Sequence, residues 1–208
     1  GIYGFGARGG IALTSPHSAG TNPLFTWAEL EPAEGAYNWS AIDEEVAAAE
    51  AAGKHTILRI YTNEDAFAQP TPEWFFSLPG AQFYYPSVSA ARLGFRAPVP
   101  WDPMFQQRFG AFVQAFGQRY NDNPTVRLMQ TNAGGGVYGE MVMSVEGLTP
   151  AGWRLDLQRA STLYWMDVWE QAFPNTPKAL MVNSLGAGLA EGLSEQAAKR
   201  GYYLEQHT

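Results

Sequence analysis

The feature that most constrains this chain is a regular alternation of strand-like and helix-like segments along its length. Runs rich in β-branched and aromatic residues predict strands at residues 1–5, 23–27, 55–61, 125–132, 179–183 and 202–206. Apolar residues at helical spacing predict helices at residues 40–52, 102–120, 149–172 and 187–200. Strands that alternate with helices in this way indicate an α/β fold built on a parallel sheet.

Length and composition fit one folded domain. The chain has 208 residues, and 46% of them are hydrophobic, which is enough for a sizeable core. A net charge of −7 argues against nucleic-acid binding, and the absence of cysteine excludes disulfides, Cys-ligated zinc and a thiol nucleophile. Only 16% of the residues are charged, so neutral polar groups and aromatic rings supply much of the polarity. Such groups suit neutral, hydroxyl-rich ligands such as sugars.

Two architectures satisfy this alternation, an open doubly wound sheet and a (β/α)8 barrel. A doubly wound sheet with a phosphate site needs a Gly-rich turn that leads directly into a helix. Gly134-Gly135-Gly136 follows a strand but fits neither GxGxxG nor GxxxxGK[ST]. The loops after the second, third and fourth strands are long, as in barrel enzymes, whose sites lie at the strand C-termini. We therefore predict a TIM barrel that is incomplete in this chain, with about six of its eight βα units.

The two ends of the sequence suggest a piece of a longer protein. The chain begins at Gly1 without a signal-like segment, and it ends at Thr208, just after the start of a predicted strand. We expect a single catalytic domain over residues 1–208, truncated at its C-terminus. The missing strands would come from the rest of the protein or from another chain. The expected location is secreted or periplasmic, with the cytoplasm as the alternative.

A long segment, residues 62–101, separates the third strand from the next helix. It is rich in proline and aromatic residues, and a structureless loop of this length is unusual unless it is functional. Most of its rings should pack among themselves, but some are candidates for stacking against sugar rings. Trp101 is the best of these candidates, because it lies just before the helix on the C-terminal side of the strands.

One segment resembles a known family. Residues 27–43 read Trp-Ala-Glu-Leu-Glu-Pro-Ala-Glu-Gly-Ala-Tyr-Asn-Trp-Ser-Ala-Ile-Asp. This resembles the W-x-x-[IL]-[EQ]-P-x-x-G-x-Y-x-[WF]-x-x-[IL]-D segment of the large (β/α)8 clan of retaining glycoside hydrolases, which includes β-galactosidases, cellulases and xylanases. The resemblance implies a barrel fold and a glycosidase activity. The segment itself should be structural, with a turn that packs Tyr37 and Trp39 against the helix at 102–120, and with its glutamates in solvent.

The resemblance also implies where the catalytic carboxylates belong. Retaining glycosidases use two, one as acid/base and one as nucleophile. In the clan the acid/base is a glutamate after strand four, often directly after an asparagine, but here Ala133 follows Asn132. Glu140 comes a few residues later on a Gly-rich turn, with Tyr138 beside it, and is the acid/base candidate; a surface or loop-stapling role is the alternative. The nucleophile belongs after strand seven, outside this chain, and Glu205 is the only late alternative.

Several other polar residues are candidates for substrate binding. Arg59 lies in an apolar strand, where it must be paired, either with a catalytic carboxylate or in a structural ion pair. Tyr61 shares its strand face. Asn132 and Asn183 end strands four and five, where their amides would bind sugar hydroxyls or cap loops. Together with Trp101 and Tyr138, these residues form the predicted binding set.

Two functions follow from these observations. The first is a glycoside hydrolase that cleaves O-glycosidic bonds of an oligo- or polysaccharide by carboxylate acid/base catalysis. The alternative is a non-catalytic carbohydrate-binding or scaffold barrel that lacks the carboxylate pair, which the Asn132–Ala133 junction favours. The expected partner is a carbohydrate rather than a nucleic acid or a membrane. We expect no metal or cofactor, because the histidines show no ligand spacing.

Overall fold

The computed structural model describes residues 1–6, 8–63, 69–132, 145–181 and 187–205. Within this part of the chain, the main sheet is entirely parallel and has the order β1-β2-β4-β7-β8-β9. A short strand, β3, pairs with β4 beyond the end of β2, so β2 and β3 together fill one strand position. The strands are β1 (Ile2–Gly6), β2 (Ser18–Pro23), β3 (Phe25–Thr26), β4 (His55–Tyr61), β7 (Val126–Thr131), β8 (Lys178–Met181) and β9 (Tyr203–Glu205).

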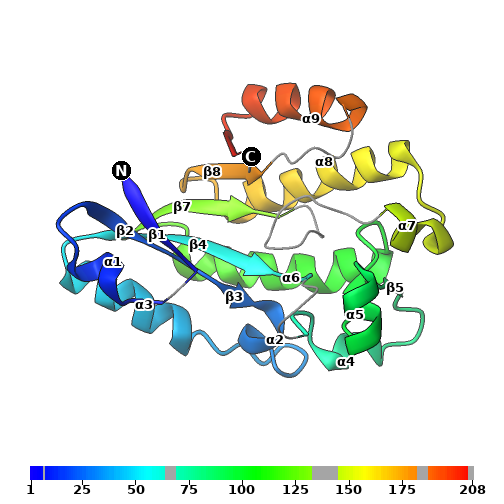
Figure 1. Ribbon diagram of the computed structural model, residues 1–208, viewed down its shortest axis with the longest axis horizontal. Helices are drawn as coiled ribbons and strands as arrows, with labels where there is room; N and C mark the ends of the chain where they lie inside the picture. The colour runs from blue at the N-terminus through cyan, green and yellow to red at the C-terminus, as the bar shows by residue number, and fades with distance from the viewer. Residues whose placement is uncertain (7, 64–68, 133–144, 182–186, 206–208) are drawn as a thin grey trace.

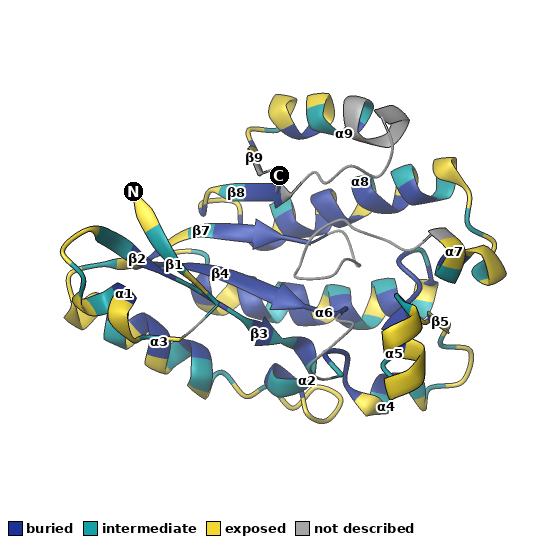
Figure 2. Cartoon of the chain, viewed as in Figure 1, coloured by how far each residue is buried: buried dark blue, intermediate teal, exposed yellow. Residues whose placement is uncertain are grey.

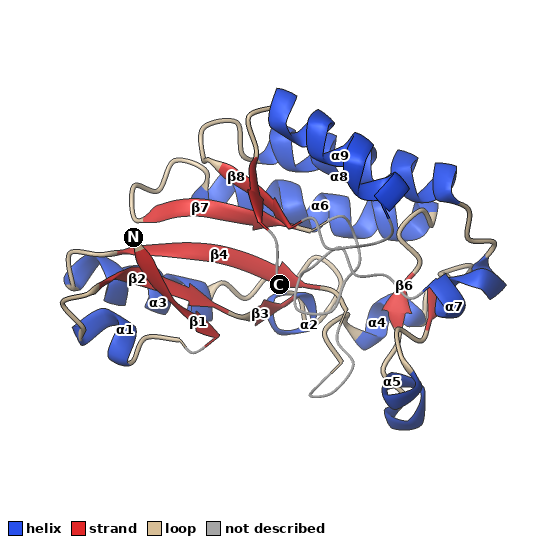
Figure 3. Ribbon diagram, turned by 45° about the horizontal axis from the view of Figure 1, so that its top comes forward, coloured by secondary structure: helices blue, strands red, loops and turns tan. Residues whose placement is uncertain are grey.

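Parallel neighbours in chain order confirm the prediction of an incomplete barrel with six strand positions. The helices lie on one side of the curved sheet, as they do around a barrel, rather than on both sides (Figures 1 and 3). The long helices are α3 (Ser40–Ala51), α6 (Pro103–Tyr120), α8 (Leu155–Ala172) and α9 (Ala187–Lys199). Two single-turn helices are α1 (Ile11–Thr14) and α2 (Trp27–Leu30). No described helix is long and apolar enough to cross a bilayer.

The main core fills the space between the sheet and its helices. Figure 2 shows buried residues along the strands and along the long helices that cover them. From β4, Leu58 and Ile60 point into it. The phenylalanines of α6 form a ladder of stacked rings, and Phe105 and Phe109 lie 5.3 Å apart between centroids. Trp165 of α8 packs against both of these rings. The apolar residues that predict the helix at 102–120 are therefore core residues, and Asp102 caps this helix by accepting from the Met104 backbone N–H.

Gly117 allows α6 and α8 to approach closely. A Cβ at this position would lie 2.1 Å from the backbone oxygen of Ala172. We expect Gly117→Ala to lower the free energy of unfolding by about 1–3 kcal/mol, because rigid backbone has to move apart. Gly110, on the same helix, is the matched control, since its Cβ would meet nothing closer than 3.8 Å. Gly110→Ala should be neutral or stabilise the protein by about 0.5–1 kcal/mol in urea unfolding. Equal effects at the two positions would contradict this account.

The N-terminal part of the chain differs from the sequence-based expectation. Residues 6–22, for which no element is predicted, contain α1 and most of β2, and the strand predicted at 23–27 is reduced to β3. The sequence of β2, Ser-Ala-Gly-Thr-Asn-Pro, has loop composition, but the sheet requires a small residue there. A Cβ on Gly20 would lie 1.8 Å from the backbone oxygen of His55. Close contact between strands therefore overrides the local propensity.

The segment at 62–101 is not a structureless loop. Its described part contains α4 (Glu73–Phe76), α5 (Val88–Leu93) and an antiparallel pair of strands, β5 (Phe83–Tyr84) and β6 (Ala97–Pro98). The expected helix at 149–172 is also divided. A 3₁₀ turn over Thr149–Ala151 follows α7 (Val145–Leu148), and Gly152, at φ 76°, separates this turn from α8.

Candidate active site

The two faces of β4 separate the core from the site. Residues two apart on a strand share a face, and the core takes Leu58 and Ile60. Ile57, Arg59 and Tyr61 therefore lie on the opposite face, which is turned away from the helices and which we call the inner face. Ile57 is near the N-terminal end of β4, and Tyr61 is its last residue. Active sites of barrel enzymes lie at the C-terminal end, where Tyr61 is found.

Arg59 is the charged centre of this end of the inner face. Its side chain is fully buried. The guanidinium carbon lies 4.5 Å from the ring centroid of Phe5 on β1 and 5.0 Å from that of Tyr61. These cation–π contacts hold the guanidinium in a fixed orientation between two rings. Arg59 and Tyr61 thus come together as predicted, while Phe5 is a neighbour that the sequence did not indicate.

Two side-chain amides lie on the strands that flank Arg59. Gln130 of β7 is the register partner of Arg59, and its Oε1 lies 3.5 Å from the Nδ2 of Asn22 on β2. Because β4 lies between β2 and β7, this contact spans the strand that carries Arg59. Asn22 and Gln130 were not among the predicted residues. The sequence could have indicated Gln130, because residues two apart on a strand share a face and Gln130 lies two residues before Asn132.

Asn132 follows β7 directly and is fixed on two sides. Its side-chain Nδ2 donates to the backbone oxygen of Ile60 at 2.6 Å, and its own backbone oxygen accepts from Trp169 Nε1 at 2.8 Å. The first bond ties the end of β7 to β4, which is the loop-capping role given as the alternative for this residue. It also fixes the chain at the point from which residue 133 continues. A role in substrate binding is still a prediction.

Asn63 is a further candidate that the sequence did not reveal. It follows β4, is 1% exposed, and donates from Nδ2 to the phenolic oxygen of Tyr84 on β5 at 3.0 Å. Its Oδ1 is buried and has no hydrogen-bond partner in the part of the chain that the structure describes. Burial raises the pKa of Tyr84 well above its usual range, although Asn63 opposes the shift, so the phenol stays neutral. The pair ties the end of β4 to the 62–101 segment.

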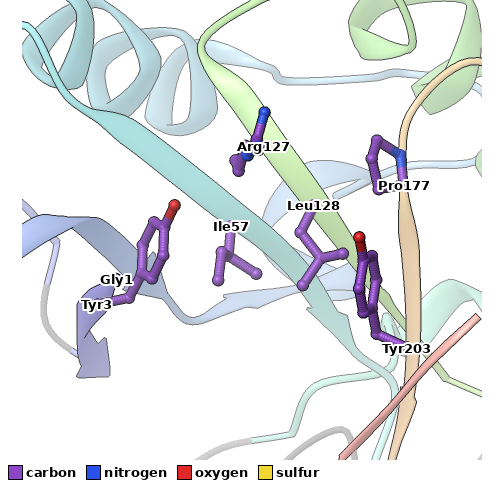
Figure 4. Close-up of a pocket in the computed structure, with 7 residues that line it drawn as sticks. All are labelled: Gly1, Tyr3, Ile57, Arg127, Leu128, Pro177 and Tyr203. Atoms are coloured by element: carbon purple, nitrogen blue, oxygen red, sulfur yellow. The ribbon is translucent and has the colours of Figure 1, made fainter.

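The N-terminal end of the inner face is different in character. Here lies a hollow of about 460 Å³, and Figure 4 shows the seven residues that line it: Gly1, Tyr3, Ile57, Arg127, Leu128, Pro177 and Tyr203. Its lining mixes apolar side chains with two tyrosines and Arg127, and the hollow lies at the opposite end of the strands from Tyr61. It belongs to the open interior of an incomplete barrel.

The turn at residues 27–39 is structural, as predicted, but one of its glutamates is not in solvent. Glu31 is 3% exposed and accepts from Trp27 Nε1 at 2.6 Å and from the Gly35 backbone N–H at 2.7 Å. Burial raises the pKa of this carboxyl, and the two hydrogen bonds oppose the shift. The carboxylate thus holds the turn together. Trp39 stacks on Phe116 of α6, which confirms the predicted packing.

The other predicted site residues are placed less fully. Trp101 is half-buried and packs against a second core cluster, formed by Tyr84, Ala97, Val99 and Leu148. Glu205 ends β9, two residues after Tyr203, and only its backbone is described. Glu140, Tyr138 and Asn183 lie outside the described residues. The roles of all five stay predictions.

Within the described residues, no group of three or more His, Asp or Glu side chains could hold a metal ion. The C-terminal end of the sheet instead offers a buried guanidinium, aromatic rings and neutral amides. Such groups recognise hydroxyl-rich ligands through hydrogen bonds and ring stacking.

A family model described as beta-galactosidase, of glycoside hydrolase family 42, matches residues 19–143, more than half of the chain. The chain belongs to this glycoside hydrolase family. The match includes the turn at residues 27–39, the strand that carries Arg59, and Asn132. It confirms the resemblance to barrel glycosidases that the turn implies. No curated protein sequence matches the chain.

Solved structures with the same fold agree with the family. The catalytic domain of a β-amylase from Paenibacillus polymyxa has a TM-score of 0.69 at 9% identity, over 99% of this chain and 77% of that one. Endo-glycoceramidase II from Rhodococcus sp. has a TM-score of 0.56 at 13% identity, over 89% and 50%. Xylanase B from Clostridium stercorarium F9 has a TM-score of 0.53 at 14% identity, over 100% and 62%. At these identities the likeness shows the fold alone, and the chain spans only half of the glycoceramidase.

Proposed function

We propose that this protein hydrolyses O-glycosidic bonds at the C-terminal ends of its strands, with β-galactosides as the first substrates to test. The observation that carries the proposal is the buried Arg59, fixed between Phe5 and Tyr61 at the active-site end of a glycoside hydrolase family barrel. The guanidinium, the phenol and nearby amides are groups that bind and orient sugar hydroxyls. The description of the family as beta-galactosidase supports β-galactosides as the substrate class.

The chemistry requires a proton donor to the glycosidic oxygen and a second carboxylate. We assign the first role to Glu140, which follows the strand end that Asn132 ties to β4. The second carboxylate is expected after the seventh barrel strand, with Glu205 as the alternative within this chain. Arg59 is a positioning and binding group in this scheme, because its charge persists across the working pH range.

Hydrolysis of 4-nitrophenyl β-galactoside by the protein tests this function directly. We expect Arg59→Lys to lower kcat/KM by roughly 100-fold, because a flexible ammonium does not replace a planar, ring-stacked guanidinium. Arg154→Lys is the control, because Arg154 is largely exposed and pairs with Asp156 on the surface. It should leave activity unchanged. If Arg59→Lys is as active as the parent protein and has the same thermal melt, the proposal is contradicted.

A non-catalytic barrel is the second candidate, and one observation favours it. Ala133 stands directly after Asn132, where the clan places its acid/base glutamate. Under this alternative, the protein would bind galactosides without turnover. Binding measured by calorimetry together with no hydrolysis over prolonged incubation would favour it over the enzyme.

A further inference from the structure

A second hollow lies beside the active-site end of the sheet. It measures about 270 Å³ and is lined by Ala81, Gln82, Phe83, Gly147, Pro150 and Ala151. One wall comes from the 62–101 segment at β5, and the other comes from α7 and the turn after it. Figure 1 shows β5 beside α7, beyond the C-terminal end of β4, and Figure 3 shows β6, the partner strand of β5, beside α7 in the same place. The hollow is therefore on the side of the molecule where the active site is expected.

An aromatic ring forms part of the wall. Phe83 is 42% exposed on the short strand β5. Its ring meets Phe76 edge-on at 5.9 Å and Tyr85 edge-on at 5.8 Å, and the guanidinium of Arg96 lies 5.3 Å from its centroid. These neighbours fix the orientation of the ring while leaving part of it open to the hollow. A fixed, exposed ring is a suitable platform for the C–H face of a sugar.

A neutral amide stands next to this ring. The backbone of Gln82 is held on both sides, because its N–H donates to Asp102 Oδ2 at 3.0 Å and its oxygen accepts from Val99 N–H at 3.1 Å. Its side chain is exposed, and an amide offers both donors and an acceptor to hydroxyl groups. Ring and amide thus lie on consecutive residues of a fixed backbone.

The two walls share a rigid base. Tyr84, next to Phe83, is buried in the second core cluster together with Leu148 of α7. Ala151, which lines the hollow, packs against the same cluster. Because both walls rest on one apolar cluster, the hollow is formed before any ligand arrives, which reduces the entropic cost of binding.

We propose that this hollow binds a neutral sugar unit of an oligosaccharide whose reactive end lies in the active site. The proposal rests on the proposed glycosidase function and extends it to substrates longer than a disaccharide. All six lining residues are uncharged, and the nearby Arg96 is paired with Glu73, so the hollow suits a neutral ligand. Phe83 stacks on the sugar ring, and Gln82 bonds its hydroxyls.

The test compares a long and a short substrate in the same variants. We expect Phe83→Ala to raise KM for a linear galacto-oligosaccharide by about tenfold and Gln82→Ala by a few-fold, while KM and kcat for 4-nitrophenyl β-galactoside do not change. Val88→Ala is the control, since Val88 is 71% exposed on α5 and does not line the hollow. It should leave both substrates unaffected.

Two results would overturn the inference. One is an unchanged KM for the oligosaccharide in Phe83→Ala. The other is an equal loss on both substrates, which would indicate a structural role for the ring. If the protein hydrolyses neither substrate, binding of the oligosaccharide measured by calorimetry tests the hollow independently of catalysis. Weaker binding by Phe83→Ala than by the parent and by Val88→Ala supports the hollow, and equal or absent binding in all three refutes it.

Discussion

Replacing Glu140 by glutamine is expected to lower turnover of a natural β-galactoside by about 10²–10⁴-fold, with little change in substrate binding. Glutamine keeps the shape and hydrogen-bonding capacity of the side chain but removes the proton that a general acid delivers to the leaving group. The loss should be smallest for 4-nitrophenyl glycosides, because nitrophenolate leaves without protonation. Steady-state kinetics on both kinds of substrate measure this difference.

Glu146 provides a matched control for this variant. It is exposed in the first turn of α7, six residues further along the chain. Glu146→Gln should retain full activity on both substrates. Full activity of Glu140→Gln on the natural glycoside would remove the assigned role. An equal loss on both kinds of substrate would show that Glu140 does not act as the acid.

Trp27→Ala should have the largest effect on stability, a loss of about 3–5 kcal/mol in the free energy of unfolding. Trp27 is fully buried, and its ring packs against Trp74, Phe105 and Phe109. Its indole nitrogen also donates to Glu31. The substitution removes a large ring from the core and leaves a buried carboxylate short of one donor. Urea unfolding followed by far-UV circular dichroism measures the change.

Two further variants make this prediction specific. Trp27→Phe keeps much of the ring volume and loses the bond to Glu31, so it should cost less than Trp27→Ala. Leu93→Ala, at a position that is 55% exposed, should stay within about 0.5 kcal/mol of the parent. A Trp27→Ala variant that unfolds like the parent but loses activity would mean that this tryptophan binds substrate rather than supports the fold.

The barrel was predictable because its strands have a local signature. Residues 55–61 are β-branched and aromatic, and their position after an amphipathic helix indicates a parallel strand. The strand at Ser18–Pro23 carries no such signature. It exists because Gly20 permits close contact with the backbone of His55, and this requirement belongs to the sheet rather than to the segment. Local sequence patterns therefore did not predict this strand, because its small residue is required by the backbone of the neighbouring strand.

The candidate site was predictable only along single strands. The period of two placed Arg59 and Tyr61 on one face without any knowledge of the rest of the sheet. Phe5 and Gln130 join them through strand order and register, which a single sequence does not specify. The same holds for Asn63 and Tyr84, which are 21 residues apart and meet through the fold of the 62–101 segment.

Glu31 shows a different limit. A glutamate in an acidic turn is usually solvated, and the sequence supplied no reason to expect otherwise. Its burial follows from the donors that surround it, the indole of Trp27 and the backbone of Gly35. Each donor is four residues away, so the spacing was visible in the sequence. The direction of the side chain depended on how the turn packs against the core.

The central claim is that catalysis takes place at the C-terminal ends of these strands. A crystal structure of the protein with a galactose-configured iminosugar inhibitor tests it most directly. We predict that the sugar ring lies in contact with Tyr61 and within hydrogen-bond distance of Arg59 or Asn132. An inhibitor that affects turnover but binds instead in the hollow lined by Tyr3, Ile57, Leu128 and Tyr203, at the opposite end of the strands, would contradict the account.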